Sequence, residues 1–341
     1  MTAIANTIIS VPPLAEQRRI VAKLDELMVM CDEFEAAEKQ LGTLENHFSE
    51  YLPKSILQAA VQGKLVPQNP HDEPATELLE RIQNEKARLV KEGKIKKGKT
   101  LPPITTGEAP YDLPDGWVWC RLSDIGEIVG GATPLTSESA NYTNPGNGIA
   151  WITPADMKNV DNKYISRGSK DITIEGYNSC STKLLPAESV IFSSRAPIGL
   201  LAFAKNELCT NQGFKSIIPY MLSMNKWIFY SLMNMTESII GRASGTTFLE
   251  VSGEFMRKEL IPLPPLAEQQ RIVAKVDELM VLCNELENAR DIPSKPATKI
   301  VAFPQQGDTD KVAIAARGGV ENLSDKAMRV INDMIEESSN A

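Results

Sequence analysis

The sequence predicts an α+β protein, in which one globular α+β domain is flanked by two long heptad-patterned helices that form a coiled-coil-like spacer. Two observations predict this fold class. Residues 12–33 recur as residues 264–285 with the periodicity of a helix, and the stretch between Leu113 and Leu263 alternates short β-rich runs with turn residues. The chain has 341 residues, of which 42% are hydrophobic and 23% charged, so it is long enough for two domains of ordinary globular composition.

The two copies of the repeat differ at only four of 22 positions, namely Arg18/Gln270, Leu24/Val276, Met30/Leu282 and Asp32/Asn284. Each copy begins with a Pro-Pro pair, which suits a helix start because the first turn has no use for the N–H that proline lacks. Apolar residues then recur at steps of four and three, the seam of a helix that packs lengthwise on another helix. We expect helix packing and partner docking through Ile20, Leu24, Leu27, Cys31 and Phe34 in the first copy and Ile272, Val276, Leu279, Cys283 and Leu286 in the second.

The elements ahead of the domain follow from local signals. Residues 1–11 are rich in β-formers and match the run before the second copy, so we expect the final strand of a domain that this chain does not contain. The first helix is expected over 12–62, with a break near Pro53 and an end at Gly63. Residues 63–90 are expected to form a loop and a short helix capped by Asp72, and the Gly-, Pro- and Lys-rich residues 91–113 a linker.

The compact domain is expected over residues 114–263. Its strands are predicted within residues 117–122, 148–152, 189–192, 199–203 and 214–218, with one helix near 227–240. The second long helix is expected over 264–290. Residues 291–341 are expected to form a linker and a small C-terminal tail.

The motifs of common enzymes are absent from the sequence. It contains no phosphate-binding loop, no dinucleotide-binding glycine turn, no His-Glu-x-x-His and no motif of amino methyltransferases. Pro114-Asp115 followed by Asp156 and Lys158 is spaced too widely for a metal-dependent nuclease. The sequence has five scattered cysteines without a Cys-x-x-Cys pair and only two histidines, which argues against a zinc site. We therefore expect no catalytic residues, no metal and no cofactor.

Charge and hydropathy restrict the partners. The sequence has no apolar run of about 18 residues and no apolar leader after Met1, so we expect a cytoplasmic protein without a membrane partner. The net charge of −8 argues against non-specific nucleic-acid binding by the whole chain. Residues 114–262 hold 13 Lys and Arg against 14 Asp and Glu, so any nucleic-acid face requires segregation of charge within the domain.

Several motifs occur in the order found in one protein family. They are Leu113-Pro-Asp-Gly-Trp117, Leu122-Ser-Asp-Ile-Gly126, Gly130-Gly-Ala-Thr-Pro134, Gly245-Thr-Thr-Phe248 and the run from Leu260 to Gln269. This order resembles the target-recognition domain and conserved helix of the specificity (S) subunit of type I restriction-modification enzymes. Residues 55–81 resemble the region after the first helix of that family, so the resemblance covers roughly residues 5–290.

The resemblance implies a non-catalytic subunit that binds double-stranded DNA at a bipartite site and docks methyltransferase (M) subunits and, through the complex, motor-nuclease (R) subunits. Family members carry two recognition domains, whereas this chain has both helices but one recognition domain. It therefore acts alone, with a separate half-subunit, or as a homodimer. An anti-restriction or scaffold protein that competes for the methyltransferase without reading DNA is the alternative, and a stand-alone nuclease or methyltransferase is disfavoured by the missing motifs.

Within the recognition domain, polar residues in Gly-, Ser- and Asn-rich loops are the candidates for DNA contact. The candidates are Thr133, Lys158, Ser193, Ser194, Arg195, Asn211, Gln212, Lys215, Arg242, Ser244 and Thr246. Arg195, Asn211 and Gln212 have the donors and acceptors that read base edges, whereas lysines and hydroxyls suit phosphates.

Overall fold

The computed structural model describes residues 11–98, 101–105, 107–195, 197–244 and 249–291. The chain divides into one unit of residues 1–53 with 285–341 and a second unit of residues 54–284. The predicted strand at residues 1–11, apart from Val11, and the predicted tail beyond residue 291 lie outside the described residues. Among the described helices, none is long and apolar enough to cross a membrane.

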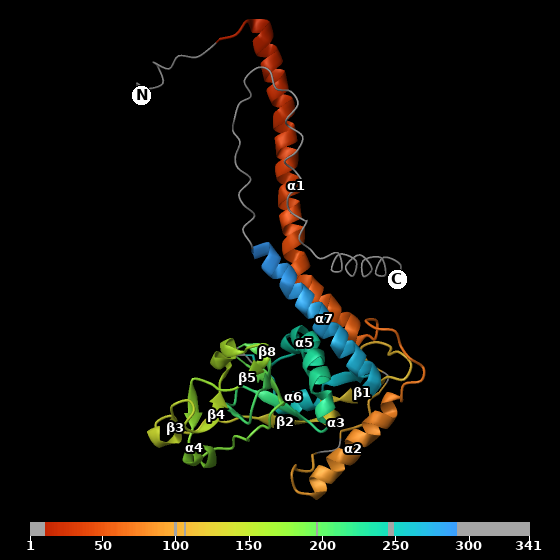
Figure 1. The fold of residues 1–341 in the computed structure, drawn as a ribbon, viewed down its shortest axis with the longest axis vertical. Coiled ribbons are helices and arrows are strands. Elements are labelled where there is room, and N and C mark those ends of the chain that lie inside the picture. Colours follow the sequence, from red (N-terminus) through yellow and green to blue (C-terminus); the bar gives the residue numbers. More distant parts are fainter. Residues whose placement is uncertain (1–10, 99–100, 106, 196, 245–248, 292–341) are drawn as a thin grey trace. The chain divides into compact units, whose positions relative to one another are not determined.

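The elements follow the predicted order (Figure 1). The helices are α1 (Leu14–Val61), α2 (Ala75–Lys91), α3 (Leu122–Ile125), α4 (Ile174–Asn178), α5 (Asn225–Gly241), α6 (Gly253–Lys258) and α7 (Leu266–Asp291), with 3-10 turns η1 (Ser139–Asn141), η2 (Pro154–Asn159) and η3 (Leu222–Met224). The strands are β1 (Val118–Arg121), β2 (Gly126–Gly130), β3 (Tyr142–Thr143), β4 (Ile149–Ile152), β5 (Tyr164–Ile165), β6 (Lys170–Ile172), β7 (Val190–Ser194), β8 (Ile198–Ala204), β9 (Cys209–Thr210), β10 (Lys215–Pro219) and β11 (Leu260–Leu263).

Helix α1 continues through Pro53, so the predicted break there was wrong. A proline inside a helix removes one backbone donor, but the helix beyond it is packed, with Ile56 only 1% exposed, and this burial offsets the loss. The predicted end at Gly63 is confirmed. Gly63 adopts φ +71°, and the N–H of Lys64 donates to the carbonyl of Ala59 at 2.9 Å, which is a glycine-terminated helix end.

Helix α2 does not use Asp72 as its cap, so that prediction was wrong. Pro74 occupies the cap position without a side-chain hydrogen bond, and the N–H of Ala75 donates instead to the carbonyl of Gly116 at 2.8 Å. The Asp72 carboxylate accepts a hydrogen bond from Arg271 at 2.6 Å. The start of α2 is therefore held by tertiary contacts, which a local capping signal does not report.

Two sheets enclose the core of the domain. One has the strand order β2-β10-β7-β8-β5 and the other β3-β6-β4-β9, and each of the five predicted β-rich runs contains a strand. Ile191 and Ala202 of the first sheet share a buried cluster with Ile152 of the second, together with Phe214. The core therefore lies between the two sheets, where alternate residues of their strands meet.

Helix α5 packs against β7 and β8 (Figure 1). The Phe229 ring of α5 stacks on Phe203 of β8 with centroids 4.5 Å apart. Phe203 alternates along β8 with Ala202 and Ala204 of the core cluster, so this contact lies on the other face of the strand. The sheet that contains β8 is thus covered by apolar residues on both faces. Accessible polar residues of this sheet are therefore found mainly in the loops at the ends of its strands.

The first and last strands of the domain pair with each other. β1 and β11 are antiparallel, with Val118 opposite Leu263 and Arg121 opposite Leu260. Helix α7 begins directly after β11, and its Glu268 carboxylate accepts a hydrogen bond from the indole N–H of buried Trp117 at 3.0 Å. The domain therefore closes where the second repeat helix begins.

Candidate nucleic-acid interface

Three loops meet at the end of strand β7. The N–H of Ser194 donates to the carbonyl of Gly213 at 2.7 Å, and the N–H of Val251 donates to the carbonyl of Ser194 at 3.0 Å. These bonds tie the end of β7 to the loop before β10 and to the segment before α6. Residues that are far apart in the sequence are thereby brought to one edge of the domain.

A fourth loop, after strand β2, joins the same place. The N–H of Ala132 donates to the carbonyl of Thr210 at 3.0 Å, and Thr133 donates through its hydroxyl to the side-chain oxygen of Gln212. Gly131 permits this approach, because a Cβ there would lie 2.1 Å from the Thr210 carbonyl oxygen. The predicted residue Thr133 is thus in direct contact with the predicted residue Gln212.

Lys215 is the centre of the resulting group. Its ammonium donates to the Ser194 hydroxyl and to the carbonyl of Gln212, both at 3.3 Å, and lies 3.5 Å from the Glu250 carboxylate. The guanidinium of Arg195 lies 3.7 Å from the same carboxylate. We call this contiguous set the recognition cluster, and its members are Thr133, Ser194, Arg195, Gln212, Lys215 and Glu250.

Glu250 was missed by the sequence analysis. Candidates for DNA contact were chosen among hydrogen-bond donors and cations, which excludes an acidic residue. The sequence also does not show that Glu250 pairs with two cations 35 and 55 positions away. The backbone N–H of Glu250 donates to the carbonyl of Ser244 at 2.9 Å, so the exposed candidate Ser244 lies beside the cluster. Thr246 lies outside the described residues.

Asn211 and Ser193 support loops, and Asn211 is half-buried. The Asn211 side-chain oxygen accepts a hydrogen bond from the N–H of Gly213 at 2.9 Å and so shapes the turn before β10. Ser193 is fully buried, and its hydroxyl bridges the carbonyl of Pro197 and the N–H of Leu200, both at 2.7 Å. Ser193 therefore braces the β7–β8 hairpin. The predicted residue Ser194 is fully buried as well, so at the end of β7 the half-buried Arg195, and not Ser194, is accessible.

The side chain of Arg242 contacts residues outside the recognition cluster. Both arms of its guanidinium donate to Glu259, at 2.8 and 2.7 Å, and the guanidinium lies 5.1 Å from the centre of the Phe255 ring. Glu259 is only 6% exposed, so a cation is required to neutralise it. Lys158, at the end of η2, is exposed and has no contact with the cluster among the described residues.

Asp156, considered above as a nuclease residue, is a structural cap. Its carboxylate accepts hydrogen bonds from the N–H and hydroxyl of Thr153 at 2.8 and 2.7 Å and from the N–H of Ser169 at 2.9 Å. Burial alone would raise the pKa of Asp156, but these hydrogen bonds hold it below its ordinary value. Among the described residues no group of His, Cys, Asp and Glu is placed to hold a metal ion.

Four of the five seam residues of the second repeat copy are buried within the unit of residues 54–284. Ile272, Val276 and Leu279 are at most 4% exposed and Cys283 is 7% exposed. The fifth, Leu286, lies outside that unit and is half-buried. The polar residues between them are engaged too. The Asp277 carboxylate accepts hydrogen bonds from Lys163 at 2.7 Å, from Lys226 at 2.9 Å and from the hydroxyl of Tyr230.

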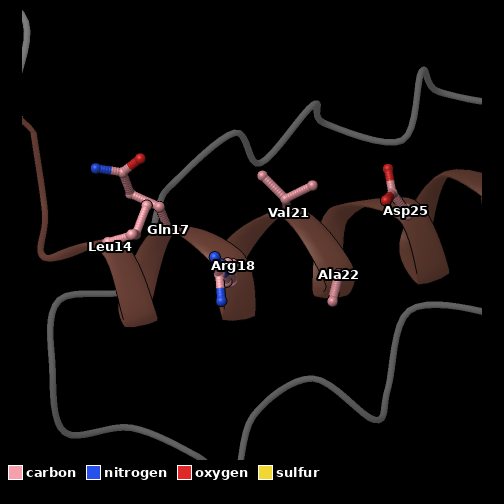
Figure 2. A pocket seen from close by; sticks show the side chains of 6 residues that line it. All are labelled: Leu14, Gln17, Arg18, Val21, Ala22 and Asp25. Carbon is pink, nitrogen blue, oxygen red and sulfur yellow. The ribbon is translucent and has the colours of Figure 1, made fainter.

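The seam of the first copy is exposed. Its exposed residues include Ile20 at 44%, Leu24 at 53%, Leu27 at 43% and Phe34 at 73%, and Cys31 is exposed as well. Figure 2 shows the first turns of α1, where Gln17, Val21 and Asp25 point to the same side of the helix. The described residues that line the hollow in this view all belong to α1, so it is a helix surface.

The matching family model is described as the type I restriction modification DNA specificity domain, and it matches residues 114–292. That range contains the whole recognition cluster and helix α7. The chain belongs to this DNA-specificity family.

Curated relatives of this chain are specificity subunits. The EcoAI specificity subunit of Escherichia coli is 33% identical over 83% of this chain and 54% of its own length. The MjaIX specificity subunit of Methanocaldococcus jannaschii is 35% identical over 55% of this chain and 43% of its own. The chain spans about half the length of the curated relatives it matches.

A solved structure supports the fold assignment. A chain from a study of complex assembly and conformational transition in the type I restriction-modification system is 25% identical and superposes with a TM-score of 0.51. The match covers 82% of this chain and 55% of that one. The α+β fold with long helices is therefore shared with a chain of a type I restriction-modification system.

Proposed function

We propose that this chain is a non-catalytic specificity subunit of a type I restriction-modification complex and reads double-stranded DNA through the recognition cluster. The observation that carries the proposal is the convergence of four separate segments in the recognition cluster around Lys215, in a domain that matches the specificity family. A domain with balanced charge reaches a DNA-binding face only by such segregation. The protein then acts where the DNA is, in the cytoplasm.

The cluster has the chemistry for two kinds of contact. Arg195 and Gln212 carry donors and acceptors suited to base edges, whereas Lys215 and Thr133 suit phosphate oxygens. Asn211 keeps its amide donors for a base while its oxygen holds the turn. The exposed Ser244 lies beside these residues, and the exposed Lys158 is a further candidate for a phosphate contact on the domain surface. Ser193 and Ser194 are fully buried and support the proposed face from within. Arg242 is paired with Glu259 and is not part of the proposed face.

The proposed partner surface is the face of α1 that the repeat defines. On α7, Glu268 and Asp277 are bonded to the recognition domain, and Arg271 is bonded to Asp72 in the loop before α2. Their counterparts in the first copy, Glu16, Arg19 and Asp25, are identical. These counterparts are exposed, and no described residue bonds to their side chains. An exposed apolar seam with this polar pattern is suited to docking another protein.

That partner, in our proposal, is a methyltransferase subunit together with a second recognition half, through which the motor-nuclease subunits join. A second copy of this chain supplies the second half in a homodimer, and a different half-subunit supplies it otherwise. A two-fold dimer places identical domains in opposite orientation, so it reads an interrupted palindrome. A hetero-pair reads an asymmetric bipartite site.

The test is co-expression of the full chain with a methyltransferase subunit of a type I system, followed by a map of methylated bases. We expect a bipartite motif, which is lost with Lys215→Ala while assembly persists, and lost together with assembly with Leu27→Asp. A contiguous motif contradicts the two-headed arrangement. Assembly without any methylation favours the alternative, a scaffold or anti-restriction protein that competes for the methyltransferase through its exposed helix.

A further inference from the structure

Glu250 is a carboxylate at the centre of a face that is proposed to meet a polyanion. Its side chain is 43% exposed and bridges Arg195 at 3.7 Å and Lys215 at 3.5 Å. A carboxylate in this position opposes phosphate binding, because it repels the phosphate and occupies both cations. Simple electrostatic attraction to DNA therefore does not explain its presence.

The position of Glu250 is built into the fold. Its N–H is bonded to Ser244, and the next residue, Val251, is only 1% exposed and bonded to the end of β7. Lys215 is also constrained, with a side chain only 15% exposed and two further hydrogen bonds to the cluster. The carboxylate is thus held between a confined lysine and a half-buried arginine.

The chemistry of the carboxylate indicates what replaces these ion pairs. A carboxylate reads DNA by accepting a hydrogen bond from an exocyclic amine, chiefly the N4 amine of cytosine, in the major groove. A base edge that presents such a donor satisfies Glu250 and releases Arg195 and Lys215 toward acceptors on the DNA. A phosphate in the same place leaves Glu250 without a donor and adds repulsion.

We propose that Glu250 is a specificity-determining residue of this interface, which holds Arg195 and Lys215 in ion pairs until an amine-bearing base edge replaces them. This inference rests on the proposed DNA-reading function, and it adds that Glu250 discriminates between DNA sequences. Glu250 lowers the affinity for DNA in general and restricts the site to one base class at the position that it faces. Specificity is thus obtained by repulsion of wrong sites as well as by attraction to the right one.

The first measurement is the affinity of the full chain for a fluorescent mixed-sequence duplex between 50 and 200 mM salt. Glu250→Gln keeps the shape and removes the charge, and we expect about three- to tenfold tighter binding at the lowest salt. The slope of log affinity against log salt should steepen by about one, the contribution of roughly one more phosphate contact. Glu250→Asp keeps the charge and should stay within about twofold of the wild type.

The matched control is Glu80→Gln, which removes the same charge from an exposed position on α2. It should bind like the wild type, and equal gains for Glu80→Gln and Glu250→Gln would mean that net charge alone is responsible. The second measurement is the methylation map with the methyltransferase subunit, in which Glu250→Gln should relax the motif at one position of each half-site read by this domain.

The outcomes separate the two ideas. If the wild type neither binds DNA nor directs methylation, the proposed function fails and this inference fails with it. If the wild type directs methylation but Glu250→Gln leaves the affinity, the salt slope or the motif unchanged, the proposed function stands and the role of Glu250 is overturned.

Discussion

The carboxylate of Asp277 on α7 accepts a hydrogen bond from Lys163 at 2.7 Å across 114 positions of sequence. The same residue of the first repeat copy, Asp25, is exposed, and no described residue bonds to its side chain. Two identical sequence contexts therefore have different environments. Asp277 contacts the recognition domain, and Asp25 lies on the surface that we propose for assembly.

Asp277→Asn should destabilise the domain. The contacts with Lys163, Tyr230 and Lys226 hold the pKa of Asp277 at about 2 against the opposing effect of burial. Because the carboxylate is 30% exposed, we discount the full shift for solvent screening and expect a loss of about 1–2 kcal/mol in the free energy of unfolding. Urea denaturation followed by tryptophan fluorescence measures it.

Asp25→Asn is the matched control. It should leave the free energy of unfolding of the isolated chain within about 0.5 kcal/mol of the wild type, since exposed positions tolerate such changes. It should instead weaken assembly with the methyltransferase subunit in size-exclusion chromatography. Equal destabilisation by both variants would contradict the assignment of separate roles.

The stability of the domain should depend on pH through the same carboxylate. Asp277 has a folded pKa of about 2, below the value of about 3.9 expected in an unfolded chain. A depressed pKa stabilises the fold above the unfolded value, and this contribution is lost as pH falls through the folded value. Between about pH 4 and 2 the wild type should therefore lose more stability than Asp277→Asn. If the unfolding free energies of the wild type and Asp277→Asn fall by the same amount between about pH 4 and 2, Asp277 is not the group responsible.

The two seams should respond differently to a buried charge. Leu279 is 4% exposed, so Leu279→Asp places an unpaired carboxylate in the core and should cost about 3–5 kcal/mol of unfolding free energy. Leu27 is 43% exposed, so Leu27→Asp should leave the isolated chain folded and abolish assembly with its partner. Circular dichroism and size-exclusion chromatography distinguish these effects, and normal assembly of Leu27→Asp would rule out a docking role for the first seam.

The elements that could be predicted are those that local patterns specify. The heptad seams predicted both long helices, and the β-rich runs predicted five strands, since periodicity and turn residues are read directly from the chain. The break at Pro53 and the cap at Asp72 were predicted from equally local signals and were wrong. At those two positions tertiary contacts, the packing of Ile56 and the bond to Arg271, outweigh local preference.

The sequence predicted which types of residue form the site, but not which side chains pair with one another in the folded domain. Arg195 and Arg242 are both arginines in polar segments, yet one lies in the recognition cluster and the other neutralises buried Glu259. The difference depends on which carboxylate each guanidinium meets in the folded domain. No local pattern contains that information, and for the same reason Glu250 was not predicted.

We therefore expect Lys215→Ala to change DNA binding and Arg242→Ala to change the stability of the domain. On a duplex that carries the recognised motif, Lys215→Ala should weaken DNA binding and reduce the salt slope by about one, with stability changed by less than about 1 kcal/mol. Arg242→Ala leaves Glu259 unpaired and should cost about 2–3 kcal/mol of unfolding free energy, with a salt slope equal to that of the wild type. Fluorescence anisotropy measures the DNA affinity of both variants, and urea denaturation measures their stability. A reduced salt slope of DNA affinity for Arg242→Ala would mean that Arg242 contacts DNA.

The last prediction concerns the spacing between half-sites. If α1 sets the separation of two recognition domains, its length determines the spacer in the recognised DNA. Four residues inserted between Phe34 and Leu41 lengthen a helix by roughly 6 Å, the rise of about two base pairs. We expect the methylation map of this variant to show both half-sites unchanged and a spacer altered by one or two base pairs.

Seven inserted residues are the informative control for that experiment. Four residues shift the phase of the seam, whereas seven preserve it and lengthen the helix by roughly 10 Å. A spacer that grows by about three base pairs with seven residues, and less with four, supports a rigid helical spacer. If methylation is lost with four residues and retained at the original spacing with seven, the seam phase governs assembly and the helix length does not set the spacer.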